Sequence, residues 1–376
     1  MNAVETIQQL RNEKNLDYVI SDHNPYRLTV NEKNVQTSYL FSTPIRFKSS
    51  GILNDCTWHE NYGKYQSNGV SFDSKISVNN NTITLQKPRH RYALSGESVQ
   101  TVCSTGDKLV GKDICITLTS NGVMVSTRSV AGKPVSFSLK TSNPRLNIRC
   151  NSQYFAFLEN KLSPAVTLSV LYYRTNNKIC YPLLLTSEKI DNYTYNITFI
   201  PSVSMDGDIL FEFNLYEEKL FQDTTVSEKL PDENNAFGSV AYIGHTNTFG
   251  EQWLYSKTIF SHMEKYFFDK VQSMTIWIPK LSNDRPNLSA YKMEQRFCSF
   301  GSTWNNKTPY ENKEISINET EEYLLLDITT SNIIDGWLFP TNGLLLKISD
   351  CSNSHLVIST GDSYAYPQIM EIRTNR

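Results

Sequence analysis

The sequence lacks features that mark several large classes of protein. It has no run of eighteen or more apolar residues, so we expect no helix that inserts into a membrane. Its first twenty residues contain no basic segment followed by an apolar one, so we expect no classical secretory signal peptide. The 36 Lys and Arg residues nearly balance the 38 Asp and Glu residues, leaving a net charge of −2. This balance argues against a nucleic-acid partner.

Motifs for common catalytic and metal sites are also missing. The chain has no H-E-x-x-H, no G-x-S-x-G and no Walker A sequence, and its 6 histidines are scattered. Its 7 cysteines form no C-x-x-C pair, and their number is odd. This pattern argues against both a zinc ribbon and a disulfide framework. We therefore expect free, buried thiols and a non-catalytic protein.

The sequence is rich in strand signals instead. It contains 21 Tyr and 18 Phe residues, which favour strands. From Tyr39 onward, short alternating or apolar segments, such as Tyr193–Phe199 and Ile209–Leu215, are separated by turn dipeptides such as Asn121-Gly122. We therefore predict a mainly β protein built of tandem antiparallel β-sandwich domains. A short amphipathic helix is expected within residues 1–13.

The length of the chain requires more than one sandwich domain. Residues 1–37 are predicted to form the N-terminal helix and an extended docking segment. Residues 38–216 are predicted to form a β-rich scaffold, with a division into two small sandwiches near 95–110 left open. Residues 217–376 are predicted to form a C-terminal module, because a charged stretch begins at residue 217 and four of the five tryptophans follow it.

An ordered set of motifs in the C-terminal module resembles a known family. The motifs are Phe221–Val226, Asn234–Gly238, Val240–Gly250, Ser302–Pro309, Leu324–Thr329, Asn342–Lys347 and Tyr366–Ile372. In this order they resemble a DNRLRE-type domain over about residues 221–373. That family is a β-sandwich module of surface and secreted bacterial proteins, and some of its relatives are classed as carbohydrate-binding modules. The resemblance implies a binding role rather than catalysis.

One strand of this module differs from the family pattern, and a second region of the chain shows a weaker resemblance. The strand that carries an Arg and an Asp in the family here reads Trp-Leu-Tyr-Ser-Lys-Thr-Ile-Phe over residues 253–260, so any contact made by those two groups is in doubt. Residues 40–90 are weakly similar to the strand pairs that precede such modules in wall-associated proteins. There these strand pairs form a non-enzymatic scaffold.

A sugar-binding surface requires exposed aromatic rings for stacking and polar groups for the hydroxyls. The candidate ligand-binding residues are Trp253, Tyr255, Trp277, Tyr364 and Tyr366. Tyr364 and Tyr366 share a face if their segment is extended. The alternative is that most aromatic side chains lie in the core, and Trp304 is interpreted as a core anchor.

A structural Ca²⁺ ion is a second hypothesis, because sandwich modules use carboxylates and carbonyls to hold one. Asp206 and Asp208 flank Gly207, and Asp223 lies near the start of the C-terminal module. The alternative is a simple turn for the first pair and a cap at the start of a strand for Asp223. No other cofactor is expected.

These observations favour a non-catalytic surface or appendage protein. Its C-terminal sandwich would bind cell-surface polysaccharide or cell-wall glycan, or would pack against other subunits of a larger assembly. We expect it on an extracellular surface or a virion. One alternative is a structural component of a phage particle, such as a capsid decoration, tail or fibre protein. A second alternative is a polysaccharide-active enzyme, because the separation of two catalytic carboxylates depends on the fold.

Overall fold

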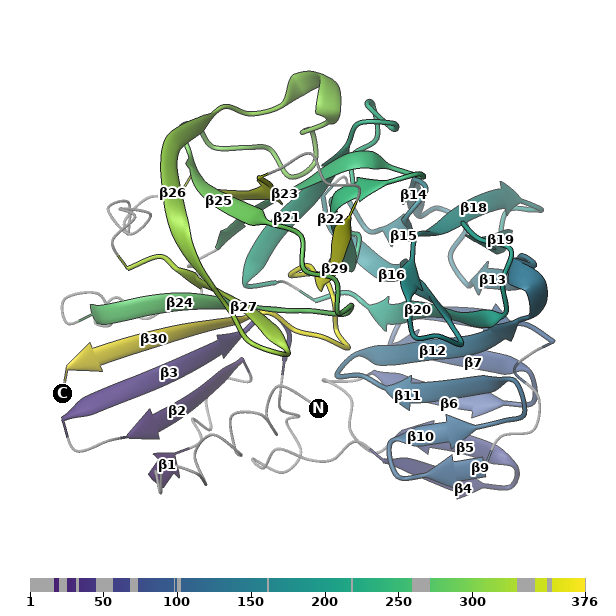
Figure 1. Ribbon diagram of the computed structural model, residues 1–376. Helices are drawn as coiled ribbons and strands as arrows, with labels where there is room; N and C mark the ends of the chain where they lie inside the picture. Colours follow the sequence, from purple (N-terminus) through teal and green to yellow (C-terminus); the bar gives the residue numbers. More distant parts are fainter. Residues whose placement is uncertain are drawn as a thin grey trace. The chain divides into compact units, whose positions relative to one another are not determined.

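The computed structural model describes residues 17–19, 26–31, 34–44, 57–67, 74–97, 99, 103–160, 162–217, 219–258, 271–329, 342–349 and 354–375 (Figure 1). Within these ranges the regular structure consists of strands in antiparallel sheets and short 3₁₀ turns. The predicted mainly β class is therefore confirmed. The predicted helix in residues 1–13 lies outside the described residues. None of the helical segments in the described ranges has the length and apolar character needed to cross a membrane.

The chain divides into two compact units. The terminal unit comprises residues 1–45 and 218–376, and the central unit comprises residues 46–217. Residues 1–37 are predicted from the sequence to form an N-terminal helix and an extended docking segment. In the structure, strand β3 (Val35–Phe41) pairs with strand β30 (Ile369–Asn375). Strands from both ends of the chain therefore lie side by side in one sheet of the terminal unit.

The described part of the central unit contains two antiparallel sheets. One has the order β18-β19-β13-β8-β7-β6-β5-β4, and the other has the order β14-β15-β16-β20-β12-β11-β10-β9, with β17 beside β16. The strands of the first sheet are β4 (Trp58–Asn61), β5 (Lys64–Ser67), β6 (Lys75–Asn79), β7 (Thr82–Lys87), β8 (His90–Ser95), β13 (Val135–Thr141), β18 (Leu183–Lys189) and β19 (Thr194–Pro201). The strands of the second are β9 (Cys103–Thr105), β10 (Lys108–Val110), β11 (Ile114–Leu118), β12 (Gly122–Ser129), β14 (Asn147–Cys150), β15 (Tyr154–Leu158), β16 (Pro164–Thr175), β17 (Cys180–Tyr181) and β20 (Gly207–Leu215).

The two sheets of the central unit share one hydrophobic core. Every second residue of β19 is buried, as expected for a strand with one face on a core. Phe199 of β19 stacks on Phe211 of β20, with ring centroids 4.3 Å apart, so the contact joins the two sheets. Residues on both sides of the stretch 95–110, such as Ile83 and Ile116, lie in this single core. The arrangement is sandwich-like.

The strands of the terminal unit follow one continuous path in its described part. Their order is β1-β2-β3-β30-β24-β27-β26-β25-β28-β23-β22-β29, with β21 beside β23. The remaining strands are β1 (Asp17–Val19), β2 (Arg27–Asn31), β21 (Phe221–Ser227), β22 (Val240–Thr246), β23 (Gly250–Thr258), β24 (Val271–Pro279), β25 (Leu288–Met293), β26 (Tyr310–Glu319), β27 (Tyr323–Asp327), β28 (Leu344–Ile348) and β29 (His355–Ser359).

Strand β26 belongs to two layers of this path and curves between them (Figure 1). Its residues from Tyr310 to Ile315 pair with β25, and its residues from Ser316 to Glu319 pair with β27. We call the side with β25, β28, β23, β22, β29 and β21 the β23 layer, and the side with β27, β24 and β30 the β24 layer. Ile276 of the β24 layer and Leu254 of the β23 layer lie in the same hydrophobic core. The terminal unit is therefore also sandwich-like.

The described cysteines are more exposed than the sequence analysis predicted. None of these five forms a disulfide, and among them only Cys180 is buried, while Cys115 is half-buried. Cys103, Cys150 and Cys298 are exposed, so the prediction of buried thiols is wrong for these three. Cys103 lies on β9 and Cys150 on β14, which are the two end strands of their sheet. An end strand has a neighbour on one side only, which leaves more of its surface open to solvent.

Candidate functional site

The β23 layer carries a small second core on the face that points away from the main core. Side chains alternate along a strand, so Leu254 of β23 enters the main core while Trp253 and Tyr255 lie on the other face. Tyr255 is fully buried there and stacks on Phe297, with ring centroids 5.6 Å apart. Burial raises the pKa of Tyr255. Tyr255, one of the predicted ligand-binding residues, is thus covered by protein.

Four half-buried rings pack against this small core. They are Trp253, Tyr291, Trp304 and Tyr310, and we call them the aromatic cluster. The centroid of the Trp253 ring lies 5.2 Å from that of Trp304 and 6.1 Å from that of Tyr310. The Tyr291 and Tyr310 rings are 4.8 Å apart. The interplanar angles are 59°, 87° and 43°, so the rings are tilted against one another rather than stacked face to face.

Trp304 reaches the cluster from a loop, and a distant asparagine holds that loop. Trp304 begins a single 3₁₀ turn between β25 and β26. The side-chain amide of Asn234 donates hydrogen bonds to the carbonyl oxygens of Ser299 and Ser302, each at 2.8 Å. These bonds fix the segment that leads into the turn, so Asn234 orients Trp304 indirectly.

Two lysines lie over the faces of the aromatic cluster. The Nζ atom of Lys307 is 3.7 Å from the ring centroid of Trp304 and 4.7 Å from that of Trp253. The Nζ atom of Lys347 is 5.2 Å from the centroid of Trp253 and 5.5 Å from that of Tyr310. These distances suit cation–π attraction between an ammonium group and the negative face of a ring. Side chains alternate along β28, so Lys347 lies on the same face as Leu345, which belongs to the small core.

Two carboxylates accept hydrogen bonds from the cluster. Glu251 accepts the indole N–H of Trp253 at 2.7 Å, two residues along the same strand. Glu314 of β26 accepts the hydroxyl of Tyr291 at 3.0 Å and the hydroxyl of Ser289 at 2.9 Å. These bonds restrict the orientation of two rings. The site thus combines ring faces, ammonium donors and carboxylate acceptors on one surface.

Trp277 lies in the other layer of the terminal unit. It sits on β24 with a side chain that is 8% exposed. Its ring makes edge contacts with Tyr39 at 5.8 Å and with Tyr323 at 5.5 Å. The structure therefore does not bring Trp277 into the aromatic cluster.

Tyr364 and Tyr366 lie in an irregular segment of bends before β30 rather than in a strand. The alternation that would place them on one face therefore does not apply. Tyr364 is buried, and the Nζ atom of Lys219 lies 3.2 Å from its ring centroid. Lys219 also donates to the carbonyl oxygen of Asp362 at 3.2 Å. Tyr366 is half-buried, and its backbone N–H donates to the hydroxyl of Ser363.

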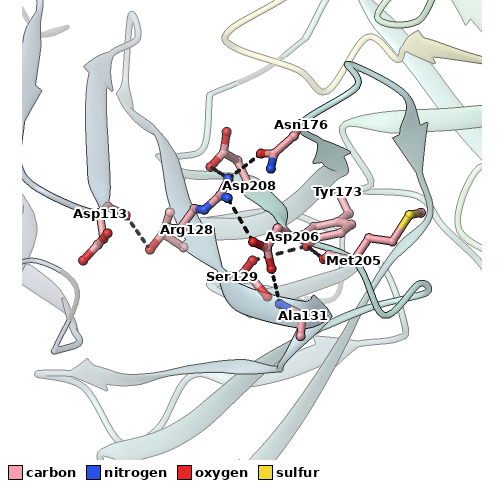
Figure 2. Close-up of polar contacts among 10 residues, drawn as sticks. Asp113, Arg128, Ser129, Ala131, Tyr173, Asn176, Met205, Asp206 and Asp208 are labelled. Atoms are coloured by element: carbon pink, nitrogen blue, oxygen red, sulfur yellow. Dashed lines mark hydrogen bonds and ion pairs between the residues drawn. The ribbon is translucent and has the colours of Figure 1, made fainter.

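Asp206 and Asp208 face an arginine of the central unit, as Figure 2 shows. The guanidinium of Arg128 lies 3.6 Å from a carboxylate oxygen of Asp206 and 3.7 Å from one of Asp208. It also donates to the side-chain oxygen of Asn176 at 2.8 Å. Asp206 accepts the backbone N–H of Ala131, a residue with a φ of 54°. The positive charge beside both carboxylates thus comes from the protein itself.

Asp223 has separate surroundings in the terminal unit. Its buried carboxylate accepts hydrogen bonds from the hydroxyl of Ser256 at 2.5 Å and from the backbone N–H of Gly361. Burial raises the pKa of Asp223 to about 6, although both hydrogen bonds and Lys219 act in the opposite direction. The three predicted metal ligands do not belong to one unit. Among the described residues, no group of three His, Cys, Asp or Glu side chains is arranged to hold a metal ion.

Comparison with known proteins identifies no family for this chain. No family model matches it, and no curated protein matches it significantly. One solved structure that aligns with it is the N-terminal domain of an adhesin from Streptococcus gordonii. The sequences are 7% identical, the alignment covers 96% of this chain and 87% of that chain, and the TM-score is 0.15. A TM-score this low does not show a shared fold.

Of the four rings in the aromatic cluster, Trp253 alone is among the ligand-binding residues predicted from the sequence. Trp304 is predicted to be a core anchor, and Tyr291 and Tyr310 are not among the predicted site residues. The alternation of β25 and β28 partly indicates which residues lie at the cluster. In each strand a polar or amphipathic residue lies two positions from a buried residue, on the same face. The pairs are Tyr291 with Met293, and Lys347 with Leu345. That pattern gives the face of each strand, but not which strands are neighbours.

Proposed function

We propose that this chain is a non-catalytic carbohydrate-binding protein and that the aromatic cluster is its binding surface. The observation that carries the proposal is the convergence of four half-buried rings with two lysines and two carboxylates on one face of the β23 layer. The rings come from β23, β25, β26 and a loop.

The chemistry of a saccharide suits such a surface. The C–H faces of a sugar ring pack against aromatic rings, and its hydroxyls hydrogen-bond to flanking donors and acceptors. Lys307 and Lys347 supply donors, while Glu251 and Glu314 supply acceptors. A surface with few polar groups binds one sugar unit weakly. Strong attachment to a polysaccharide then requires several sites on one chain or several copies of the protein.

The sequence resemblance supports the same proposal. The motifs over residues 221–373 resemble a DNRLRE-type β-sandwich, some of whose relatives are classed as carbohydrate-binding modules. Trp304 and Lys347 lie within those motifs, whereas Trp253 lies in the strand over residues 253–260 that departs from the family. In this proposal the protein acts on a cell surface or a virion, and the central unit serves as a scaffold.

A glycan array with the full chain tests the proposal. The wild-type protein is expected to bind at least one class of polysaccharide. The double variant Trp253→Ala/Trp304→Ala is expected to weaken that binding by at least about tenfold, since each ring removes a stacking contact of about 1 kcal/mol. Tyr193→Ala removes an aromatic ring that is 51% exposed in the central unit, and it serves as the matched control.

Thermal melting and circular dichroism establish that each variant is folded. Trp304→Phe provides a second check, because it keeps a ring at the site and is expected to retain part of the binding. The proposal is wrong if the wild-type chain binds no glycan, or if the folded double variant binds as tightly as the wild type. Light scattering on the same protein tests the alternative of a particle component, which predicts large assemblies without glycan binding.

A further inference from the structure

We propose that the aromatic cluster selects saccharides that carry an anionic group, either a carboxylate or a phosphate, through Lys307 and Lys347. This inference rests on the proposed carbohydrate-binding function and specifies its ligand. Two separate segments, the loop before β26 and strand β28, each place an ammonium group over the ring of Trp253. Both ammonium groups lie within 5.2 Å of the centroid of Trp253.

The two lysines differ from their neighbours in their electrostatic partners. Lys280 lies 2.5 Å from a carboxylate oxygen of Glu319, and Lys292 lies 3.3 Å from one of Glu311. Among the described residues, neither lysine of the cluster has a carboxylate within 4.0 Å. In the described part of the chain, the nearest contacts recorded for both ammonium groups are ring faces. A charge-assisted hydrogen bond from an ammonium group to an anion is roughly twice as strong as one between neutral groups.

The carboxylates of the cluster are already engaged by neutral donors. Glu251 accepts from the Trp253 indole, and Glu314 accepts from two hydroxyl groups. They contact the polar edges of Trp253 and Tyr291, whereas the lysines contact ring faces. Positive and negative charges therefore lie at different parts of the rings. An anionic substituent is expected on the lysine side, and sugar hydroxyls are expected at the carboxylates.

The position of Lys307 distinguishes an anionic ligand from a neutral one. Its Nζ atom is 3.7 Å from the Trp304 centroid, which is the separation at which the atoms of a stacked sugar would lie. A neutral sugar must displace this ammonium group and lose its cation–π attraction. An anionic sugar that stacks there displaces the ammonium group as well, but it offers that group a charge-assisted hydrogen bond in return. The geometry therefore favours acidic saccharides over neutral ones of the same shape.

The test compares matched ligands on the full-length protein by calorimetry. Tetragalacturonate and its methyl ester differ in the carboxylate charge, and phosphomannan and dephosphorylated mannan differ in the phosphate. The wild type is expected to bind the acidic member of at least one pair about tenfold more tightly. The pair in which the acidic member binds more tightly shows whether the preferred anion is a carboxylate or a phosphate. The preference is expected to shrink as salt concentration rises, because screening weakens exposed charge pairs.

Variants of the lysines complete the test. The double variant Lys307→Gln/Lys347→Gln is expected to lose the preference for the acidic ligand while keeping the rings. Lys108→Gln removes an exposed lysine from β10 of the central unit and is expected to keep the preference. If the wild type binds acidic and neutral members equally, and the Trp253→Ala/Trp304→Ala variant loses both, this inference fails and the proposed function stands. If neither member of either pair nor any array glycan binds, both fail.

Discussion

Raising the pH from about 4 to about 7 is expected to destabilise the terminal unit through one buried carboxyl group, that of Asp223. This side chain lies on β21 and is hydrogen-bonded to Ser256 on β23 and to the backbone of Gly361. Burial raises its pKa from 3.8 to about 6, and this effect outweighs the hydrogen bonds and the charge of Lys219. The folded chain therefore holds a proton that the unfolded chain releases at lower pH.

The difference between the pKa of Asp223 in the folded chain and in the unfolded chain sets the sign and size of the change in the free energy of unfolding. Between pH 3.8 and about 6 the folded state binds more protons at Asp223 than the unfolded state, so the free energy of unfolding falls as the pH rises. Each pKa unit corresponds to about 1.4 kcal/mol, so a difference of about two units lowers the free energy of unfolding by about 3 kcal/mol. The decrease is complete above about pH 6 and absent below pH 3.8.

Urea denaturation across this pH range measures the effect. Tryptophan fluorescence reports mainly on the terminal unit, because Trp58 is the only one of the five tryptophans within residues 46–217. Asp223→Asn is the reference, since an amide cannot titrate and the contributions of all other carboxylates cancel in the difference. The stability of the wild type relative to the variant should fall by about 2 kcal/mol from pH 4 to pH 7, because the unfolded chain is already more than half ionised at pH 4. A difference that stays constant over this range would refute the reasoning.

Two further predictions concern the cores of the two units. Phe199→Ala removes the ring that stacks on Phe211 between the sheets of the central unit, and it should cost about 3–5 kcal/mol of that unit's stability in denaturation followed by circular dichroism. A cost below about 1 kcal/mol would contradict the shared core. Lys257 donates to the carbonyl oxygen of Phe297, and burial lowers its pKa from 10.5 to about 8. The terminal unit should therefore gain stability as the pH rises from about 8 to 10.5, relative to Lys257→Met, and an unchanged difference would contradict the assigned environment.

Local patterns in the sequence predicted the strands well. The segment Tyr193–Phe199 alternates in sequence, and β19 spans Thr194–Pro201 with every second residue buried. The segment Ile209–Leu215 corresponds to β20, which begins two residues earlier at Gly207. Alternation is a local property, because a strand with one face on a core must place its apolar residues two apart. The identity of the neighbouring strands is not local, and no residue of β19 specifies them.

The predicted calcium ligands illustrate the limit of local patterns. Asp206 and Asp208 are close in sequence, and two nearby carboxylates suggest a cation. The cation that faces them belongs to Arg128, which lies opposite Asp208 in the register of β12 against β20. That pairing joins residues 80 positions apart in the chain, from 128 to 208. Sequence spacing gives the carboxylates, whereas the partner depends on strand pairing.

The sequence alone determined that this chain is mainly β and where many of its strands lie, because burial on one face imposes a two-residue period. Only the tertiary structure decided that β3 pairs with β30 and that Trp253, Tyr291, Trp304 and Tyr310 meet on one surface. Both outcomes depend on the register between strands that are distant in the chain. Alternation within one strand determines which of its faces is buried, but it does not identify the partner strand.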